Sequence, residues 1–177
     1  MILMARHGET TFNAERRFQG WSARAVLTDK GRAEARELAE QAAGEDLAAL
    51  YASPLARARE TAAIVAERVG LEPTVDERFA ETNTGDWTEQ LYDNVDPELY
   101  AQWEHAGADW RFPGGESLEE QQERVIAGLV DVTQRGTLPA LIICHRGTIR
   151  VALCHTQQRG LDMFSEIDVP NGGLVHL

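Results

Sequence analysis

Residues 1–10 read MILMARHGET, an apolar run followed at once by an arginine, a histidine and a glycine. The run predicts a short buried strand over 2–5. In open α/β sheets, ligands bind in the crevice beyond the carboxyl ends of the strands. Arg6 and His7 therefore lie where a functional site is expected.

After this strand, short apolar runs alternate with helical patterns, which is typical of βα units. Further strands are expected near AALYA (48–52) and at ALIIC (140–144). Capping residues and apolar spacing predict helices from Thr28 to about Gly44, from Ser53 to Gly70, from Ser117 with Glu120 as a capping box, and over 148–155. The pattern predicts an α/β fold, a three-layer α/β/α sandwich with a mostly parallel central sheet.

The length of 177 residues is enough for one domain with a substantial core. We expect a single domain over 1–177. The stretch from about 82 to 115 is rich in Trp, Asp, Gly and Pro, and we expect it to be an insertion with one or two short helices that walls a pocket. Its tryptophans, Trp87, Trp103 and Trp110, are expected to pack inside this insertion, and a place at the pocket mouth is the alternative for each.

The formal net charge of −12 argues against nucleic acid and anionic membranes as partners. A few arginines gathered in one pocket would still attract a small anionic substrate. No apolar stretch approaches the roughly 20 residues of a membrane span, and 1–10 lacks the features of a secretory signal, so a cytoplasmic protein is expected. Cys144 and Cys154 read as reduced core thiols, and no zinc-binding motif is present.

Polar groups follow three of the predicted strands. Arg6 and His7 follow the first, Ser53 to Arg57 the second, and His145 follows ALIIC. Because parallel strands end at the same edge of a sheet, these groups should meet. Two histidines and two arginines suit a phosphoryl group, since guanidinium groups bind its oxygens in pairs. One neutral imidazole is then expected to act as nucleophile, and the other, protonated, to neutralise developing charge.

These residues also resemble the sequence motifs of a known protein family. MARHGET (4–10) resembles the signature of the histidine phosphatase superfamily, also called the phosphoglycerate mutase-like family. The likeness continues in the family's order with Asn13, RFQGW (17–21), LTDKG (27–31), SPLARARET (53–61), FAETNTGDW (79–87), PGGES (113–117) and ICHRGTIR (143–150). It covers most of the chain, and it implies a phosphoglycerate mutase-like fold.

The resemblance implies a role for each matching residue. His7 resembles the nucleophile that becomes transiently phosphorylated, and Arg6, Arg57 and His145 resemble the rest of the phosphate pocket. Glu81 resembles the proton donor to the leaving group. The remaining pocket residues, which resemble groups touching the phosphoryl group or the substrate, are Asn13, Gln19 and Thr10. The family uses neither a metal nor an organic cofactor.

The chain departs from the family beside its second histidine. Arg146 stands where the family commonly has a glycine. If that position required a positive φ, the arginine would strain the turn. Otherwise Arg146 either adds a cation to the substrate pocket or points to solvent. Further departures around the expected entrance put substrate specificity in doubt more than mechanism.

The sequence favours a metal-independent phosphatase acting on a small phosphorylated metabolite, and three alternatives stay open. The first is a phosphoglycerate mutase, which shares the pocket residues; mutases of the family are typically longer, whereas here 32 residues follow His145. The second is a catalytically silent protein that binds phosphorylated ligands. The third is a cysteine-dependent phosphatase, because CHRGTIR (144–150) also fits CxxGxxR. The sequence does not select a substrate, and it is compatible with a homodimer.

Overall fold

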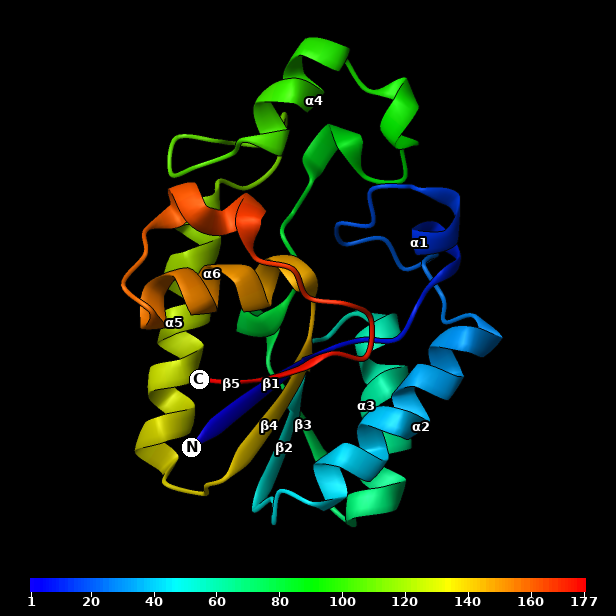
Figure 1. Cartoon of the computed structure of the whole chain (residues 1–177), viewed down its shortest axis with the longest axis vertical. Helices are drawn as coiled ribbons and strands as arrows, with labels where there is room; N and C mark the ends of the chain where they lie inside the picture. Colours follow the sequence, from blue (N-terminus) through cyan, green and yellow to red (C-terminus); the bar gives the residue numbers. More distant parts are fainter.

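A five-stranded sheet runs through the centre of the molecule (Figure 1), as seen in a computed structural model that describes residues 1–177. The strand order is β3-β2-β4-β1-β5. Four strands are parallel and the last is antiparallel to β1. The bounds are Ile2–Arg6 for β1, Ala49–Ala52 for β2, Pro73–Val75 for β3, Ala140–Cys144 for β4 and Leu174–His176 for β5. The predicted, mostly parallel sheet is confirmed.

Helices cover both faces of the sheet, which makes the predicted three layers (Figure 1). On one face lie α2 (Asp29–Ala43) and α3 (Ala56–Val69), and on the other lie α5 (Leu118–Arg135) and α6 (Arg146–Thr156). Strand residues alternate between the two layers: Leu3 packs with α2 and α3, whereas Met4 packs in the cluster of α5 and α6. Each such buried side chain contributes about 1.5–3 kcal/mol.

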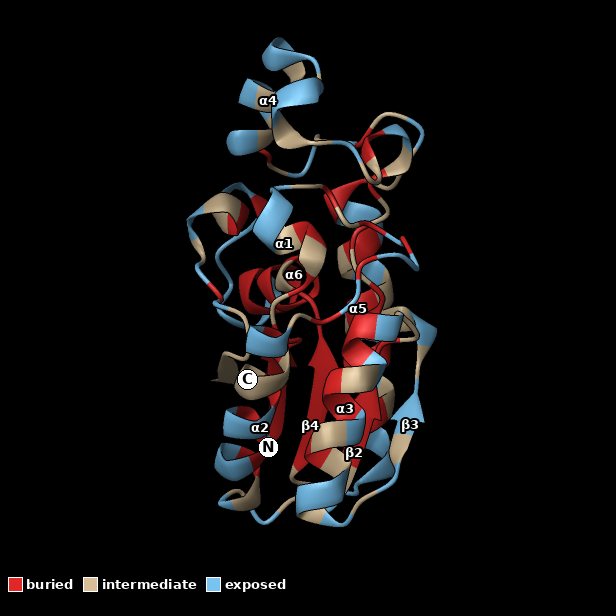
Figure 2. Cartoon of the chain, turned by 90° about the vertical axis from the view of Figure 1, so that its right-hand side faces the viewer, coloured by how far each residue is buried: buried red, intermediate tan, exposed pale blue.

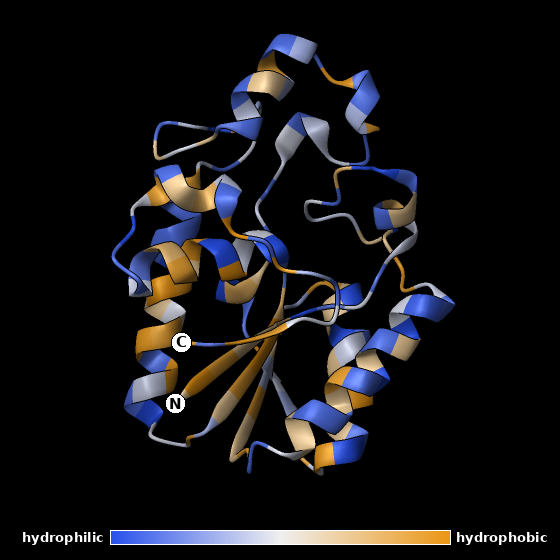
Figure 3. Cartoon of the chain, viewed as in Figure 1, coloured by the Kyte–Doolittle hydropathy of each residue, from blue (hydrophilic) through white to orange (hydrophobic).

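The two central strands, β1 and β4, are buried on both faces, as Figure 2 shows for β4. This double burial explains their continuous apolar sequences, ILMA and ALIIC. Figure 3 shows that the centre of the molecule, where the sheet lies, is largely hydrophobic. The edge strands β3 and β5 have three residues each and were not predicted, because so short a segment carries no periodicity.

Two helix boundaries differ from the predictions. The caps at Thr28 and Ser117 are confirmed, the latter as a capping box with Glu120. Ser53, however, does not cap a helix: α3 has Leu55 as its N-cap and begins at Ala56. The Ser53 hydroxyl accepts from the Leu55 amide over 3.3 Å, just before the helix, and also contacts His145, as described below. The helix after β4 begins at Arg146, two residues before the predicted start.

The segment from 82 to 115 lies above the carboxyl ends of the strands (Figure 1). It holds one helix, α4 (Pro97–Glu104), and two 3₁₀ turns, Gly85–Trp87 and Tyr92–Asn94. It has its own small core, in which Trp87 and Phe112 pack against Phe18, so this tryptophan has the expected packing role. Phe18 follows the short helix α1 (Thr11–Glu15); two other 3₁₀ turns cover Glu77–Phe79 and Leu161–Glu166.

Candidate active site

The predicted polar groups meet at the carboxyl edge of the sheet. The rings of His7, after β1, and His145, after β4, have centroids 5.1 Å apart. Arg57, in the first turn of α3, donates from Nε to His7 Nε2 over 3.3 Å. Both histidines and Arg57 are at most 1% exposed. The adjacency of β1, β2 and β4 in the sheet explains why residues so distant in sequence come together.

His7 is held in one tautomer by the main chain. Its Nδ1 lies 2.7 Å from the carbonyl oxygen of Gly8, which can only accept, so Nδ1 carries the proton and Nε2 keeps its lone pair. Burial, together with Arg57 and Arg6, holds the pKa of His7 well below its usual range. The neutral imidazole expected of a nucleophile is therefore present. Glycine is needed at position 8, since a Cβ there would overlap the carbonyl group of Gly31.

The charge of His145 in the free protein is set by its surroundings. Burial is the largest cause that lowers its pKa well below the usual range, and Arg57 and His7 lower it further, so this imidazole is neutral in the free protein. The predicted protonated form concerns the state with a phosphoryl group bound. His145 Nε2 lies 2.7 Å from Ser53 Oγ, and its Nδ1 is buried without a partner. Ser53, predicted as a helix cap, instead orients this ring.

Two guanidinium groups flank the histidines. Arg57 is fixed by the carbonyl oxygens of Gly20 and Ser22, at 2.8 and 3.4 Å from its terminal nitrogens. Arg6 donates to Val169 O over 2.7 Å and keeps a buried Nε without a partner. Burial lowers the pKa of each to about 10, so both stay charged at neutral pH. They form a positive site beside His7 Nε2.

Glu81 reaches the same pocket from the segment after the Glu77–Phe79 turn. Its carboxylate accepts from the Thr82 amide over 2.9 Å and from the Gly147 amide, at the start of α6, over 3.4 Å. Its main-chain oxygen accepts from the Trp21 indole over 2.6 Å. The carboxyl group is thus held against the first turn of α6.

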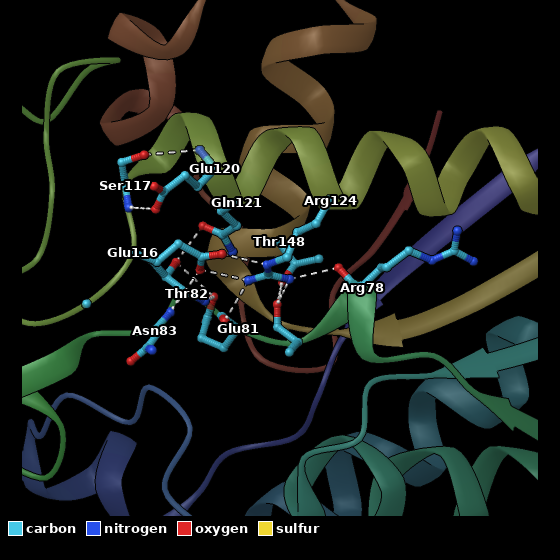
Figure 4. A network of polar contacts seen from close by, with 12 residues as sticks. Arg78, Glu81, Thr82, Asn83, Glu116, Ser117, Glu120, Gln121, Arg124 and Thr148 are labelled. Carbon is cyan, nitrogen blue, oxygen red and sulfur yellow. Dashed lines mark hydrogen bonds and ion pairs between the residues drawn. The ribbon is translucent and has the colours of Figure 1, made fainter.

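A partly buried network fixes the backbone that carries Glu81 (Figure 4). Arg124, on α5, donates to the main-chain oxygens of Arg78, Ala80 and Glu81 over 2.8–2.9 Å. It also makes two bonds to the Glu116 carboxylate, at 2.6 and 2.9 Å, and Glu116 accepts from the Asn83 amide. The ion pair therefore clamps the segment on both sides of Glu81. Sequence reasoning missed Arg124, although it follows PGGES by a few residues.

The predicted substrate-binding residues are placed in two ways. Asn13, Gln19 and Arg146 line the pocket. Thr10 does not: it is completely buried and caps α1, and its hydroxyl bonds to Gln19 Oε1 and Asn13 Oδ1. Its role is to orient these two amides, which corrects the prediction of direct substrate contact. Arg146 has helical φ as the first residue of α6, so it causes no strain.

The pocket wall includes Trp103, for which a place at the pocket mouth was one of the two alternatives, and further residues that sequence reasoning did not place. Aromatic side chains come from α1's loop, the 82–115 segment and the turn after α6: Phe18, Tyr92, Trp103, Phe112 and Phe164. Arg17 and Arg150 also line it. The helix predicted over 148–155 leaves out Arg146; because α6 begins at Arg146, the two arginines lie four residues apart on one face of the helix.

Cys144 does not reach the pocket. It is completely buried in the core cluster beneath α5 and α6, and this burial raises the pKa of its thiol. A reactive thiol needs the opposite, a partly exposed and positively charged surrounding that lowers the pKa. Arg150, the arginine of the CxxGxxR pattern, donates from Nε to Ile167 O over 2.6 Å. The geometry therefore disfavours the cysteine-dependent alternative.

No group of three or more His, Cys, Asp or Glu side chains is placed to hold a metal ion. None of the helices combines the length and apolar character that crossing a membrane requires.

Comparisons with known proteins agree with this geometry. Residues 2–177 match the family model of the histidine phosphatase superfamily, branch 1. A curated relative from Salmonella choleraesuis, "Probable phosphoglycerate mutase GpmB", is 35% identical over 146 residues, which cover 80% of this chain and 67% of the relative.

Two solved structures are similar over nearly the whole chain. Bacillus stearothermophilus YhfR has a TM-score of 0.89 and 29% identity, and the match covers 99% of this chain and 90% of that one. A mycobacterial glucosyl-3-phosphoglycerate phosphatase, solved in complex with VO3, has a TM-score of 0.87 and 27% identity, covering 98% and 88% respectively.

Proposed function

The chain belongs to branch 1 of the histidine phosphatase superfamily, and from this we propose that it is a metal-independent phosphatase that hydrolyses a small phosphate monoester through a phosphohistidine on His7. The observation that carries the proposal is the state of His7 Nε2: it carries no proton, since Nδ1–H is committed to Gly8 O, and its lone pair accepts only one long hydrogen bond, over 3.3 Å from Arg57 Nε, in an arginine-rich pocket.

In the first step, His7 Nε2 attacks phosphorus while the bond from phosphorus to the ester oxygen breaks. The leaving alkoxide takes a proton from the carboxylic acid of Glu81. Arg6 and Arg57 neutralise the charge on the phosphoryl oxygens. The carbonyl oxygen of Gly8 accepts a hydrogen bond from Nδ1–H of the positively charged phosphoimidazole. In the second step, the Glu81 carboxylate takes a proton from water as its oxygen attacks phosphorus, the P–N bond breaks, and neutral His7 is regenerated.

His145 fits a supporting role in both steps. It is neutral in the free protein, and its buried Nδ1 lacks a partner. A bound phosphoryl dianion is negatively charged and raises the pKa of a neighbouring imidazole. Protonation of His145 is thus proposed to accompany substrate binding, which places the second positive imidazole beside phosphorus only when charge develops there.

A phosphoglycerate mutase is the second candidate, favoured by the name of the 35% identical relative. The names of the structural relatives favour hydrolysis, as one is a glucosyl-3-phosphoglycerate phosphatase. A mutase would convert 3-phosphoglycerate to 2-phosphoglycerate faster than it releases inorganic phosphate. A phosphatase would release phosphate faster, and measuring both products from the same reaction separates the two activities.

The test of the proposed mechanism is hydrolysis of p-nitrophenyl phosphate in buffer without metal, with EDTA added. The wild type should release p-nitrophenolate, and His7→Ala should reduce kcat by at least about 10³-fold, since it removes the nucleophile. His155→Ala, which removes an exposed histidine, is the matched control and should keep wild-type activity. Cys144→Ser should retain most of its turnover; if Cys144→Ser were inactive and His7→Ala active, the cysteine mechanism would replace this one.

A further inference from the structure

The arginines of this chain fall into two groups. Most of those on the surface pair with a carboxylate within 4 Å, as expected for a chain of net charge −12. Those without such a partner are three exposed residues, Arg36, Arg59 and Arg159, and four at the pocket: Arg6, Arg57, Arg146 and Arg150. Unpaired positive charge is therefore concentrated around the candidate active site.

A single phosphoryl group requires only two of these four guanidinium groups, so the other two are available for another part of the substrate. Arg6 and Arg57 flank the nucleophile His7, whereas Arg146 and Arg150 lie one turn apart on α6. Arg146 makes no side-chain hydrogen bond or ion pair within the chain. Arg150 uses Nε for Ile167 O and packs over the Phe164 ring at 5.2 Å, which leaves its terminal nitrogens available.

Arg146 and Arg150 lie where the pocket continues outward. The pocket over His7 and a neighbouring hollow share both arginines together with Trp103 and Phe164, and the hollow is completed by Glu104 and Ser165. Glu104 is the acidic group at this rim, and it lies more than 4 Å from either guanidinium group. The arginines thus face the space that the leaving group of a phosphate ester would occupy.

Keeping these positive groups together has a cost in the free protein. Arg146 is, after burial, the largest cause that lowers the pKa of both Arg6 and Arg150, in each case to about 10. Mutual repulsion of this kind is relieved when an anion binds between the groups. Glu81 and Asp168 offset part of this repulsion at Arg150, but neither forms an ion pair with Arg146 or Arg150. A phosphoryl group bound at Arg6 and Arg57 therefore leaves the outer pair without a paired carboxylate.

We propose that Arg146 and Arg150 form a second anion subsite, so that the preferred substrates are phosphate monoesters whose leaving group carries a carboxylate or a second phosphate. This inference rests on the proposed function for the position of the phosphoryl group. Arg146 determines specificity most directly, since Arg150 is also tied to Ile167 O. Trp103 and Phe164 bound the carbon chain that connects the two anions.

The test is calorimetric binding to His7→Ala, in which turnover is blocked. Two pairs of probes differ by one anionic group: 3-phosphoglycerate against glycerol 3-phosphate, and fructose 1,6-bisphosphate against fructose 6-phosphate. In at least one pair, the probe with two anionic groups should bind about 10- to 100-fold more tightly than its partner, the range of a charge-assisted hydrogen bond. The pair that shows the preference identifies the second group as carboxylate or phosphate.

The preference should depend on Arg146. In His7→Ala/Arg146→Ala the ratio of affinities within the responding pair should fall to about 1–3, and Arg146→Lys should keep part of it. His7→Ala/Arg59→Ala removes an unpaired surface arginine and should keep the full ratio. An unchanged ratio in the Arg146→Ala background, or no preference in either pair, would overturn the subsite.

Kinetics separate this inference from the proposed function. If the wild type releases no phosphate from any ester while the binding preference persists, the proposed function fails and the subsite stands. If the wild type hydrolyses both members of each pair with equal kcat/KM and the affinities are also equal, the proposed function stands and the subsite fails.

Discussion

Replacing Arg124 by methionine should lower kcat strongly on esters with poor leaving groups, such as glycerol 3-phosphate, and much less on p-nitrophenyl phosphate. Arg124 does not line the pocket; it acts on the main chain that carries Glu81, through bonds to the carbonyl oxygens of residues 78, 80 and 81. Methionine fills a similar volume and makes none of these bonds. Glu116 would keep only the Asn83 amide as a partner.

The loss of stability follows from the burial of this pair. Removing one partner of a buried ion pair costs about 3–5 kcal/mol. The side chains of Arg124 and Glu116 are 20% and 11% exposed, so the lower end, about 3 kcal/mol, applies. For a chain of this size, about 3 kcal/mol lowers Tm by roughly 6–12 °C. Arg135→Met on the same helix breaks the exposed pair with Asp131 and should cost less than about 1 kcal/mol.

The loss of activity follows from the role of Glu81. A displacement of about 1 Å in a catalytic group costs on the order of 10²-fold, and general acid catalysis matters most for poor leaving groups. For Arg124→Met, assayed well below its Tm, kcat on glycerol 3-phosphate should fall about 10- to 100-fold. On p-nitrophenyl phosphate, whose leaving group needs little protonation, kcat should fall less than about threefold.

A second variant separates stability from positioning. Arg124→Met/Glu116→Gln removes the unpaired buried charge and should recover about 1–2 kcal/mol of stability. It does not restore the bonds to the main chain, so kcat on glycerol 3-phosphate should stay low. Equal losses on the two substrates, or recovery of activity together with stability, would refute the positioning role.

Two further predictions concern the site itself. Gly147→Ala places a Cβ that would overlap the Glu81 carboxylate and lie 2.6 Å from Thr82 Oγ1, so it should lower kcat on glycerol 3-phosphate at least about tenfold with little effect on p-nitrophenyl phosphate; equal rates for the two proteins on both esters would contradict the contact. Because burial lowers the folded-state pKa of His7 and His145 below the unfolded value of about 6.5, their contribution to stability is complete above that pH and is lost as the pH falls below it. Urea unfolding from pH 8 to pH 5 should show this decline, and His145→Gln should show a smaller one; identical pH profiles would refute the assignment.

Much of the fold could be read from local sequence patterns. The apolar runs ILMA and ALIIC, the caps Thr28 and Ser117, and helical spacing identify the central strands and most helices, because these signals come from residues within a few positions of one another. The convergence of His7, Arg57 and His145 could also be expected, since parallel strands end at a common edge.

The rest depends on contacts between distant residues. Ser53 has the sequence of a helix cap, but the N-cap of α3 is Leu55, and the fold brings the Ser53 hydroxyl 2.7 Å from His145 Nε2, 92 positions away. The hydroxyl thus serves the buried imidazole as well as the Leu55 amide next to it. Arg124 reaches Glu81 only because α5 packs against that segment. The protonation of the two imidazoles is set by burial and by neighbouring arginines, and neither can be known before the chain is folded. Short-range spacing thus determines which elements form and which residues end at the active edge, whereas long-range packing decides the charge, tautomer and orientation of those residues, because desolvation and hydrogen-bond partners exist only in the assembled core.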